Sequence, residues 1–576
     1  MDAKDHTGQK PWLRYYDEGV PTSIDYPPHA LDKLLEVSAA KFPEQPAMIF
    51  GGRLGSQVLD KPLTYRQLND SVNRFAAGVQ ELGINKGDRV AIFMPNCPQL
   101  VISYYGTLRA GGIAVPCNFL YTANEIQNQL NDSGAEVIVA LSTFYKMIDS
   151  VRENTKLRHI VVTNVKEYFP GFLKFMFTIA KEKKDGHKVA LSTDKDIWFQ
   201  DLLRDARLPP LLVDKGPADT ACLIYTGGTT GIPKGAELTH RNVVSNAVAG
   251  SYWSHSQEGK EISIGALPFF HSYGMTAVMN MTIITGGAMV LIVDPRDVLH
   301  IMGSISKHKA TFYSSVPSSY TRINTHPDVK KFDLSSVRVC LSAAAPLPRK
   351  VQETFQEITG GKLVEAYGMT ESSPATHINP LDRNKIGSIG IPWPDTDARI
   401  VDIDTGDEEL PQGEIGELIM NGPQVMKGYW RMPTETANML REHPDLGPGK
   451  WLHSGDIAYM DEEGYFRIVD RKKDMIICGG YNVYPRNIEE VLFQHPAVKE
   501  AGVVGTGDEY RGETAIAFVV LKEGMSVSEQ EIIDHCAEHL AKYKVPTRVI
   551  FREQLPLTAV GKVLRRELVK ELSESK

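Results

Sequence analysis

The segment Tyr225-Thr-Gly-Gly-Thr-Thr-Gly-Ile-Pro-Lys-Gly235 follows an apolar run, Ala221-Cys-Leu-Ile224, that is typical of a buried strand. Its glycines let backbone N–H groups approach an anion closely, and its threonine hydroxyls and Lys234 add donors and a positive charge. A Walker A loop would need Gly-Lys followed by Ser or Thr, whereas Lys234 lies between Pro233 and Gly235. The density of these residues favours a phosphate-binding loop over an ordinary turn. Its binding residues would be Thr226, Gly227, Gly228, Thr229, Thr230, Gly231 and Lys234.

Short apolar runs alternate with helical patterns upstream of this loop. Asp88–Phe93, Ile113–Pro116 and Ala135–Ala140 are typical of buried strands, and residues 68–82 and 101–111 read as helices. This alternation predicts an α/β fold built from β-α units on a parallel or mixed sheet. Near residue 400 the pattern changes to short strands between turns rich in Gly and Pro. We therefore expect a large N-terminal body of several subdomains, with mixed β-sheets and helices.

A charged junction, Asp470-Arg-Lys-Lys-Asp474, separates this body from a compact α+β pattern. Interdomain hinges are short, solvated segments that absorb dihedral changes. The junction predicts an N-terminal domain over residues 1–471 and a small mobile C-terminal domain over residues 472–576. An ordinary polar turn between two strands would have the same composition.

The composition excludes several classes of protein. Among 576 residues, 42% are hydrophobic and 23% charged, which excludes a disordered, collagenous or coiled-coil chain. The net charge of −8 argues against broad neutralisation of a phosphate backbone, so we expect no nucleic-acid partner. The six cysteines lack CxxC spacing, which makes a disulfide framework or a zinc site unexpected. The N-terminus carries no signal-peptide pattern, and Gly286-Gly287 interrupts the uncharged stretch Met275–Val293, so we expect a cytoplasmic protein.

Further motifs follow the loop in a fixed order. They are Leu267-Pro-Phe-Phe-His-Ser-Tyr-Gly274, Ser342-Ala-Ala-Ala-Pro-Leu347, Glu365-Ala-Tyr-Gly-Met-Thr-Glu371, Trp451-Leu-His-Ser-Gly-Asp456, the charged junction, Gly479-Gly-Tyr-Asn482 and Pro556-Leu-Thr-Ala-Val-Gly-Lys562. Together they resemble the acyl-adenylate-forming (AMP-binding) enzymes, which include acyl-CoA synthetases, aryl-CoA ligases, luciferases and the adenylation domains of peptide synthetases. The resemblance covers nearly the whole chain.

This resemblance implies a set of catalytic residues. Activation of a carboxylate by ATP crowds negative charge at the α-phosphorus, so the site needs cations and donors directed there. By its motif, Lys562 would bridge the carboxylate and the α-phosphate, and Thr370 would bond the phosphate. Glu371 would hold Mg²⁺, which prefers carboxylate and phosphate oxygens.

The resemblance also implies the residues that bind the nucleotide. Asp456 would accept hydrogen bonds from both ribose hydroxyls, which an ionised carboxylate can do. Arg471 would contact the ribose or a phosphate, unless it only pairs with Asp470 or Asp474. Tyr367 would offer its ring to one face of adenine. The remaining expected contacts are Gly368 and Met369 beside Tyr367, and Ala344, Ala345 and Pro346 on the other face of adenine.

Two reactions at one site follow from the same resemblance. After the acyl-AMP forms and PPi leaves, the C-terminal domain would turn about a hinge at Lys473 and remove Lys562. The loop of Gly479, Gly480 and Tyr481 would then come to the site, and coenzyme A would attack the acyl-AMP and release AMP. Domain motion of this kind gates many multi-step enzymes.

The identity of the acid is a weaker inference. His271, Tyr273 and Gly274 belong to the motif beside the acyl pocket, and the small residues Gly250 and Gly287 would leave room for an alkyl chain. Gly227, where many relatives carry Ser, and the opening Pro11-Trp-Leu-Arg-Tyr-Tyr16 are similar to bacterial medium- and long-chain fatty acyl-CoA synthetases. A fatty acid is therefore the expected substrate. A ligase for an aromatic or other carboxylic acid remains an alternative, as does a catalytically silent nucleotide- or lipid-binding relative, although Lys562 and Glu371 argue against the silent one.

An insertion at residues 168–188 is dense in large apolar side chains. Its apolar part is Tyr168–Ala180, and four lysines, Lys181, Lys183, Lys184 and Lys188, follow that part at once. An apolar helix with a basic flank can lie in an anionic membrane interface, so Phe172–Lys184 is a candidate for peripheral membrane contact. The alternative is a helix packed on the main domain with a solvated basic end.

Overall fold

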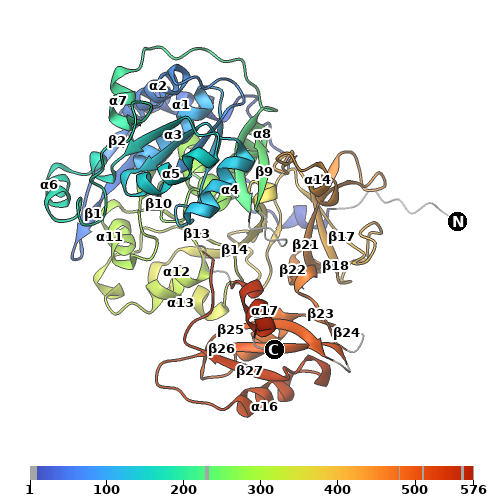
Figure 1. Ribbon diagram of the computed structural model, residues 1–576. Coiled ribbons are helices and arrows are strands. Elements are labelled where there is room, and N and C mark those ends of the chain that lie inside the picture. Colours follow the sequence, from blue (N-terminus) through green and yellow to red (C-terminus); the bar gives the residue numbers. More distant parts are fainter. Residues whose placement is uncertain (1–9, 227–232, 479–480, 509–510, 559–562, 575–576) are drawn as a thin grey trace.

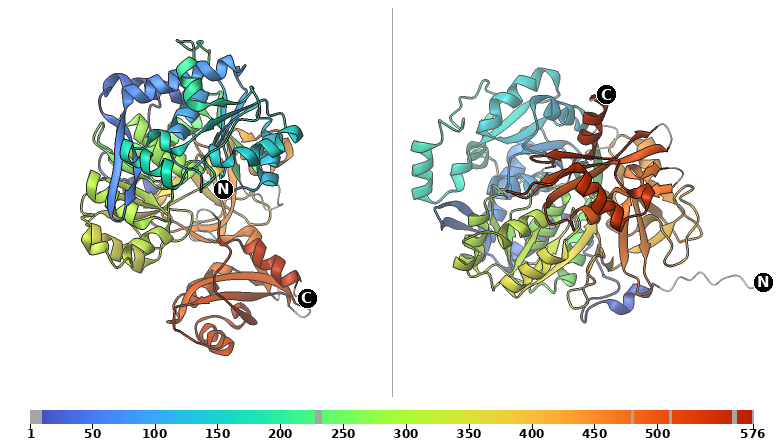
Figure 2. Two further views of the ribbon diagram at one scale, coloured as in Figure 1. Left: turned by 60° about the vertical axis from the view of Figure 1, so that its left-hand side comes forward. Right: turned by 90° about the horizontal axis from the view of Figure 1, so that it is seen from below.

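The computed structural model describes residues 10–226, 233–478, 481–508, 511–558 and 563–574. Figures 1 and 2 show a large body and, below it in the view of Figure 1, a smaller C-terminal unit reached through β22 and β23. The fold is α/β with mixed sheets and helices, which confirms the predicted fold class.

The strand before the phosphate loop lies in a mixed sheet that we call the loop sheet. Its order is β19-β9-β8-β4-β3-β5-β6-β7, in which β3 to β8 are parallel and β9 returns antiparallel to β8. The strands are β3 (Arg89–Phe93), β4 (Ile113–Pro116), β5 (Val137–Leu141), β6 (His159–Thr163), β7 (Ile197–Trp198), β8 (Thr220–Thr226), β9 (Lys234–Thr239) and β19 (Gly428–Tyr429). The helices of this region are α1 (Leu31–Lys41), α2 (Tyr65–Glu81), α3 (Pro98–Arg109), α4 (Ala123–Ser133), α5 (Tyr145–Val151) and α7 (Phe199–Asp205).

A second mixed sheet, the nucleotide sheet, carries the later motifs. Its order is β16-β15-β14-β13-β12-β10-β11-β1-β2. The strands are β1 (Pro46–Leu54), β2 (Gln57–Thr64), β10 (Ile262–Gly265), β11 (Ala288–Leu291), β12 (Phe312–Ser315), β13 (Val339–Ser342), β14 (Lys362–Gly368), β15 (Ala375–Ile378) and β16 (Ile391–Pro392). The helices in this part of the chain are α8 (His240–Trp253), α10 (Met281–Ile284), α11 (Val298–His308), α12 (Pro317–Asn324) and α13 (Arg349–Thr359).

A third, antiparallel sheet leads to the C-terminal unit. It contains β17 (Asp397–Val401), β18 (Gly416–Asn421), β20 (Leu440–Glu442), β21 (Lys450–Met460) and β22 (Phe466–Arg471), with α14 (Pro433–Met439) beside it. The C-terminal sheet contains β23 (Ile476–Cys478), β24 (Tyr481–Val483), β25 (Val498–Asp508), β26 (Gly512–Leu521) and β27 (Arg548–Arg552). Its helices are α15 (Pro485–Leu492), α16 (Glu529–His539) and α17 (Arg565–Glu574).

Local sequence signals set where several helices begin. In α2 the Thr64 hydroxyl accepts from the backbone of Gln67, and the Gln67 side chain accepts from the backbone of Thr64. The same capping box opens α4 at Thr122, α8 at Thr239 and α16 at Ser528. Each box satisfies backbone N–H groups that have no partner within the first helical turn.

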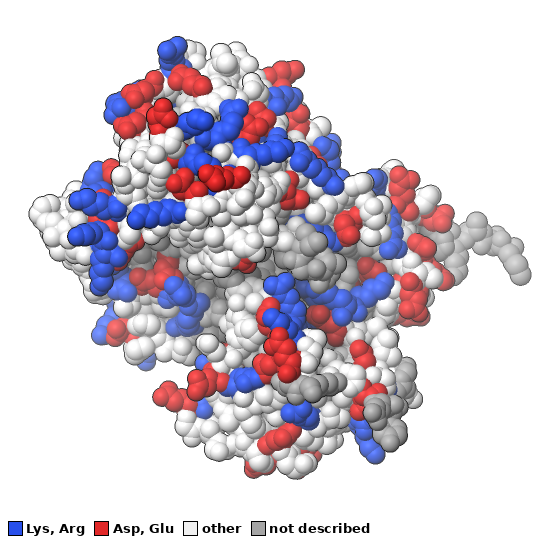
Figure 3. All heavy atoms as spheres, viewed as in Figure 1, with Lys and Arg blue, Asp and Glu red and all other residues white. Residues whose placement is uncertain are grey.

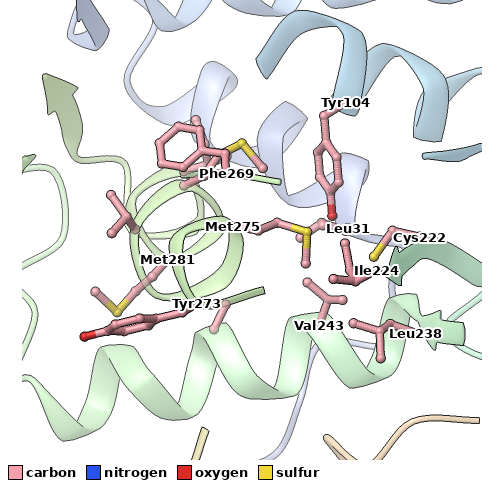
Figure 4. Packing of buried hydrophobic residues seen from close by; sticks show 14 of the residues in the cluster. Leu31, Tyr104, Cys222, Ile224, Leu238, Val243, Phe269, Tyr273, Met275 and Met281 are labelled. Atoms are coloured by element: carbon pink, nitrogen blue, oxygen red, sulfur yellow. The ribbon is translucent and has the colours of Figure 1, made fainter. Parts of the chain in front are cut away.

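The loop and nucleotide sheets share one hydrophobic core. Figure 4 shows Met275 beside Tyr104 and Cys222, with Val243 of α8 below them, and all four residues are buried. The stretch Met275–Val293 is part of this interior, and no helix in the described ranges is long and apolar enough to cross a membrane. Lys and Arg alternate with Asp and Glu over much of the face in Figure 3.

Candidate active site

The phosphate loop is bracketed by two paired strands. Thr226 ends β8 and lies opposite Lys234, which begins the antiparallel β9. The ammonium of Lys234 pairs with the carboxylate of Glu435 and lies 5.4 Å from the centre of the Tyr429 ring. The predicted contacts Gly227, Gly228, Thr229, Thr230 and Gly231 lie outside the described residues.

The motif at the end of β14 buries a carboxylate next to this lysine. Glu371 is 7% exposed, and its Oε1 accepts a 2.7 Å hydrogen bond from the Tyr429 hydroxyl. Burial raises the pKa of Glu371, and the Tyr429 hydrogen bond and the positive charges of Arg471 and Lys234 oppose that rise. The preceding Thr370 hydroxyl accepts from Ser272 at 3.4 Å, which joins this motif to the one expected at the acyl pocket.

Asp456 links three segments of the chain. Its Oδ2 accepts a 2.6 Å hydrogen bond from the Tyr367 hydroxyl at the end of β14, and its Oδ1 lies 3.3 Å from Nε of Arg471. The register of β21 and β22 places Asp456 directly opposite Arg471. A carboxylate has about four lone-pair sites, so Asp456 retains acceptor capacity beyond these two contacts.

The turn expected against adenine follows β13. Ala344 is exposed and has a φ of +71°, a left-handed conformation that is uncommon outside glycine. Such conformations cost free energy and are concentrated at functional sites. Across the neighbouring strand, a Cβ on Gly368 would lie 2.0 Å from the Pro374 carbonyl oxygen, so only glycine fits there. Met369 donates its backbone N–H to the same oxygen, and Ala345 and Pro346 continue the turn after Ala344.

The predicted pocket residues lie on a tight turn after Pro268. Tyr273 is buried, and its hydroxyl donates to the carbonyl of Leu341 at 2.8 Å. His271 accepts from the backbone of Tyr273, and a Cβ on Gly274 would lie 2.5 Å from the Pro268 carbonyl. These contacts anchor the turn beside the end of β13. The missing side chain of Gly287 does not leave open space either, because a Cβ there would lie 2.7 Å from the Glu261 carbonyl oxygen.

A rare helical form follows this turn. Residues Met275–Asn280 form a π-helix between α9 (Ser272–Gly274) and α10. π-helical turns are uncommon and are often found at functional sites. The apolar pattern of the sequence predicted burial of this segment and gave no sign of the π-helical turn.

The charged junction is held by a guanidinium from the end of the chain. Arg565 Nη1 lies 2.8 Å from Asp474, and its Nη2 bonds Glu489 at 2.8 and 2.9 Å. Asp470, which is 3% exposed, accepts from the backbone N–H of Arg486. Burial lowers the pKa of Lys473, and the nearby cations Arg471 and Arg565 lower it further. The junction is thus a network of charges rather than a simple solvated turn.

The loop expected to serve coenzyme A is only partly described. Tyr481 is 60% exposed and stacks on Tyr543 with ring centres 4.7 Å apart. Gly479, Gly480 and Lys562 lie outside the described residues. Among the residues that are described, the structure brings together Lys234, Thr370, Glu371, Tyr367, Asp456 and Arg471.

Sequence reasoning missed the partners of these groups. Tyr429 and Glu435 lie in no motif that we recognised, yet they contact Glu371 and Lys234. Glu417 was also missed: it bonds Lys472 at 3.1 Å and accepts from the backbone N–H of Gly455, next to Asp456. No spacing signal could have found them, because each lies tens of residues from its partner in the chain.

Most of the chain matches two known family models. A family model described as AMP-binding enzyme matches residues 35–430, and one described as AMP-binding enzyme C-terminal domain matches residues 487–562. The chain belongs to the AMP-binding enzyme family. This confirms the resemblance drawn from the motifs.

Curated relatives span nearly the full length of this AMP-binding enzyme. A long-chain-fatty-acid–CoA ligase of Bacillus subtilis is 44% identical over 98% of this chain and 99% of its own length. One from Escherichia coli is 39% identical over 97% and 98%. ATP-bound MatB from Rhodopseudomonas palustris is 29% identical, with a TM-score of 0.79 over 94% and 98%. An anthranilate CoA ligase bound to anthranoyl-AMP is 26% identical, with a TM-score of 0.80 over 96% and 99%.

Glu365 gives a prediction about pH and stability. Burial raises the pKa of this carboxyl to about 7 from an ordinary 4.5, and Arg486 opposes the rise. The folded state therefore holds this proton more tightly than the unfolded state, and the contribution to stability falls as pH rises from about 4.5 to about 7. Glu365→Gln should remove this dependence. Its free energy of unfolding, relative to wild type, should be higher at pH 8 than at pH 5 by up to about 3 kcal/mol.

Thermal unfolding followed by circular dichroism at the two pH values measures this difference. Glu357→Gln, at an exposed position on α13, is the matched control and should show no such change. An equal shift of Glu365→Gln at both pH values would contradict the prediction.

Proposed function

We propose that this AMP-binding enzyme is an AMP-forming fatty acid–CoA ligase. It activates a fatty acid with ATP to acyl-AMP and PPi, and then transfers the acyl group to coenzyme A with release of AMP. The observation that carries the proposal is the 44% identity, over nearly the whole of both chains, to a long-chain-fatty-acid–CoA ligase. ATP and coenzyme A as substrates fit a cytoplasmic enzyme.

The described side chains support the first reaction. Lys234 and Arg471 supply positive charge beside Glu371, and Thr370 supplies a hydroxyl. In a site shielded from water, such fixed charges stabilise the developing phosphate charge more strongly than they would in solution. We assign phosphate contact to Thr370 and Lys234, and ribose contact to Asp456. Tyr367, Gly368, Met369 and the turn Ala344-Ala345-Pro346 would surround adenine.

Glu371 fits a role as a ligand of Mg²⁺. It is a buried carboxylate that accepts a hydrogen bond from Tyr429, and burial raises its pKa, which a divalent cation would lower again. Mg²⁺ typically takes one or two carboxylates together with substrate phosphates. When bound, the ion would neutralise phosphate charge, and the buried site around Glu371 would orient it.

The second reaction requires a change at the junction. We propose domains at residues 1–471 and 472–576, with rotation about Lys473 that withdraws Lys562 and brings Tyr481 to the site. Arg565 follows Lys562 by only three residues and is bonded to Asp474 and Glu489. Motion of the junction would therefore be passed to the segment that carries Lys562.

A ligase for an aromatic acid is the second candidate. The similarity of fold to the anthranilate CoA ligase favours it, at a TM-score of 0.80, although the sequence identity is only 26%. The higher identity to the fatty-acid ligases makes the fatty acid our first choice.

The substrate class can be tested directly. CoA-dependent AMP release should be faster with palmitate than with benzoate. Each CH₂ of palmitate that the enzyme buries contributes about 0.8 kcal/mol of binding free energy, and benzoate has no alkyl chain to bury. The measurement is kcat/KM for both acids under the same conditions. Faster turnover of benzoate would show that the substrate is an aromatic acid and not a fatty acid.

The role of Lys562 separates the two reactions. Lys562→Ala should lower acyl-AMP formation by roughly 100- to 1000-fold, because a charge directed at the transition state is removed. Thioester formation from supplied acyl-AMP should be retained. PPi release and CoA consumption measure the two steps, with Lys570→Ala on α17 as the control. Equal loss of both steps would rule out an adenylation-specific role.

Tyr429 should act as a positioning residue for Glu371. Tyr429→Phe removes the hydroxyl that bonds Glu371 and should raise the Mg²⁺ concentration needed for half-maximal activity about tenfold or more. Titration of PPi release with Mg²⁺ measures this, and the exposed Tyr252→Phe is the control. A lower kcat at an unchanged Mg²⁺ requirement would contradict the assignment.

A further inference from the structure

Helix α6 (Gly171–Ala180) carries an apolar surface on the outside of the molecule. Phe172, Phe175, Met176 and Ile179 are 59%, 61%, 40% and 70% exposed. Their spacing of three, four and seven residues places them on one face of the helix. Single exposed apolar residues are common on protein surfaces, but a continuous stripe of large ones marks a contact surface.

The stripe is not needed to hold the helix on the body. The opposite face does that through Leu173, which approaches Gly52 of β1, and Phe177, which packs against Phe169 and His187. Ion pairs of 2.6 Å, Lys174 with Glu167 and Lys166 with Glu182, also fix the segment. The exposed stripe is therefore additional to what the fold requires.

Positive charge surrounds the stripe. Residues 166–188 contain six lysines against Glu167, Glu182 and Asp185, a local net charge of +3 in a chain whose total is −8. Lys181, Lys183, Lys184 and Lys188 are exposed, and within the part of the chain that the structure describes none of these four forms an ion pair. Figure 3 shows an uncharged projection at the left edge, where Figure 1 labels α6, with Lys and Arg side chains along its inner border.

We propose that α6 and the lysines after it dock this protein onto an anionic lipid bilayer. The exposed apolar face of the helix would contact the acyl chains of such a bilayer, and the basic flank would contact its negative headgroups. The lysine cluster favours a membrane over a second copy of this chain, because two such faces would bring like charges together. The proposal goes beyond the ligase activity and needs neither ATP nor a fatty acid.

Vesicle binding by the full chain tests the proposal. Without substrates, the protein should bind vesicles containing about 30% phosphatidylglycerol at least tenfold more tightly than pure phosphatidylcholine, and about 1 M salt should weaken binding. The triple variant Phe172→Ser, Phe175→Ser, Ile179→Ser should lose at least about tenfold in binding. The triple variant Lys181→Gln, Lys183→Gln, Lys184→Gln should also lose at least about tenfold in binding. The control for the serine variant is a triple of Leu208, Leu211 and Leu212 to Ser at another exposed site. The control for the lysine variant is a triple of Lys330, Lys331 and Lys350 to Gln. Both controls should bind vesicles as wild type does.

A label on the helix gives a readout that does not depend on variant folding. The six native cysteines are buried, so Met176→Cys can be labelled selectively with an environment-sensitive fluorophore. Its emission should shift to the blue on anionic vesicles, whereas a label at Leu212→Cys should not respond. Three results would overturn the proposal: no preference of wild type for anionic vesicles, unchanged binding of the serine triple at α6, or a dimer of wild type in sedimentation that this triple dissolves.

Discussion

The hydrogen bond that the Tyr367 hydroxyl donates to Asp456 joins two sheets of the N-terminal body at the candidate active site. Tyr367 ends a strand of the nucleotide sheet, and Asp456 lies in the third sheet, 89 residues further along the chain. Arg471 completes the group from the last strand before the C-terminal unit. Because Tyr367 and Asp456 lie on separate sheets, the carboxylate that we propose to bind ribose is positioned only when both sheets and the junction are assembled.

Burial sets the electrostatic character of the site. Removal from water raises the pKa of Glu365 and of Glu371. Uncompensated burial of a carboxylate is costly, so each of these groups faces a cation or a hydroxyl donor. Glu371 has Tyr429, Lys234 and Arg471, while Glu365 has Arg486 from the C-terminal unit. The same exclusion of water would strengthen the proposed interactions with the phosphates of a nucleotide.

At the junction, too, charged groups that are withdrawn from water are paired with opposite charges. Arg565, Asp470, Asp474 and Glu489 form a partly buried network in which one cation serves three carboxylates, and Asp470 is the buried member. Loss of one partner of such a network is costly because it leaves a buried charge unpaired. The network therefore favours a small number of defined arrangements, which would suit the rotation that we propose at this junction.

Much of the fold was predictable because it is written in local patterns. Apolar runs marked β3, β4, β5 and β8, and helical patterns marked most of α2 and α3. The motifs also identified the family, since their order along the chain is itself a one-dimensional property. Gly368 could be recognised as part of a motif, but the reason for glycine there, the carbonyl of Pro374, appears only in three dimensions.

Contacts between distant segments were decided by the tertiary structure. The partnership of Tyr429 with Glu371 and of Arg565 with Asp474 depends on strand order and register, which composition and spacing do not encode. The insertion shows the division most clearly. The sequence by itself determined that residues 168–188 are apolar and then basic. Only the folded chain decided that Leu173 and Phe177 face inward while Phe172, Phe175 and Ile179 face solvent, because helical geometry and the position of β1 select which side is covered.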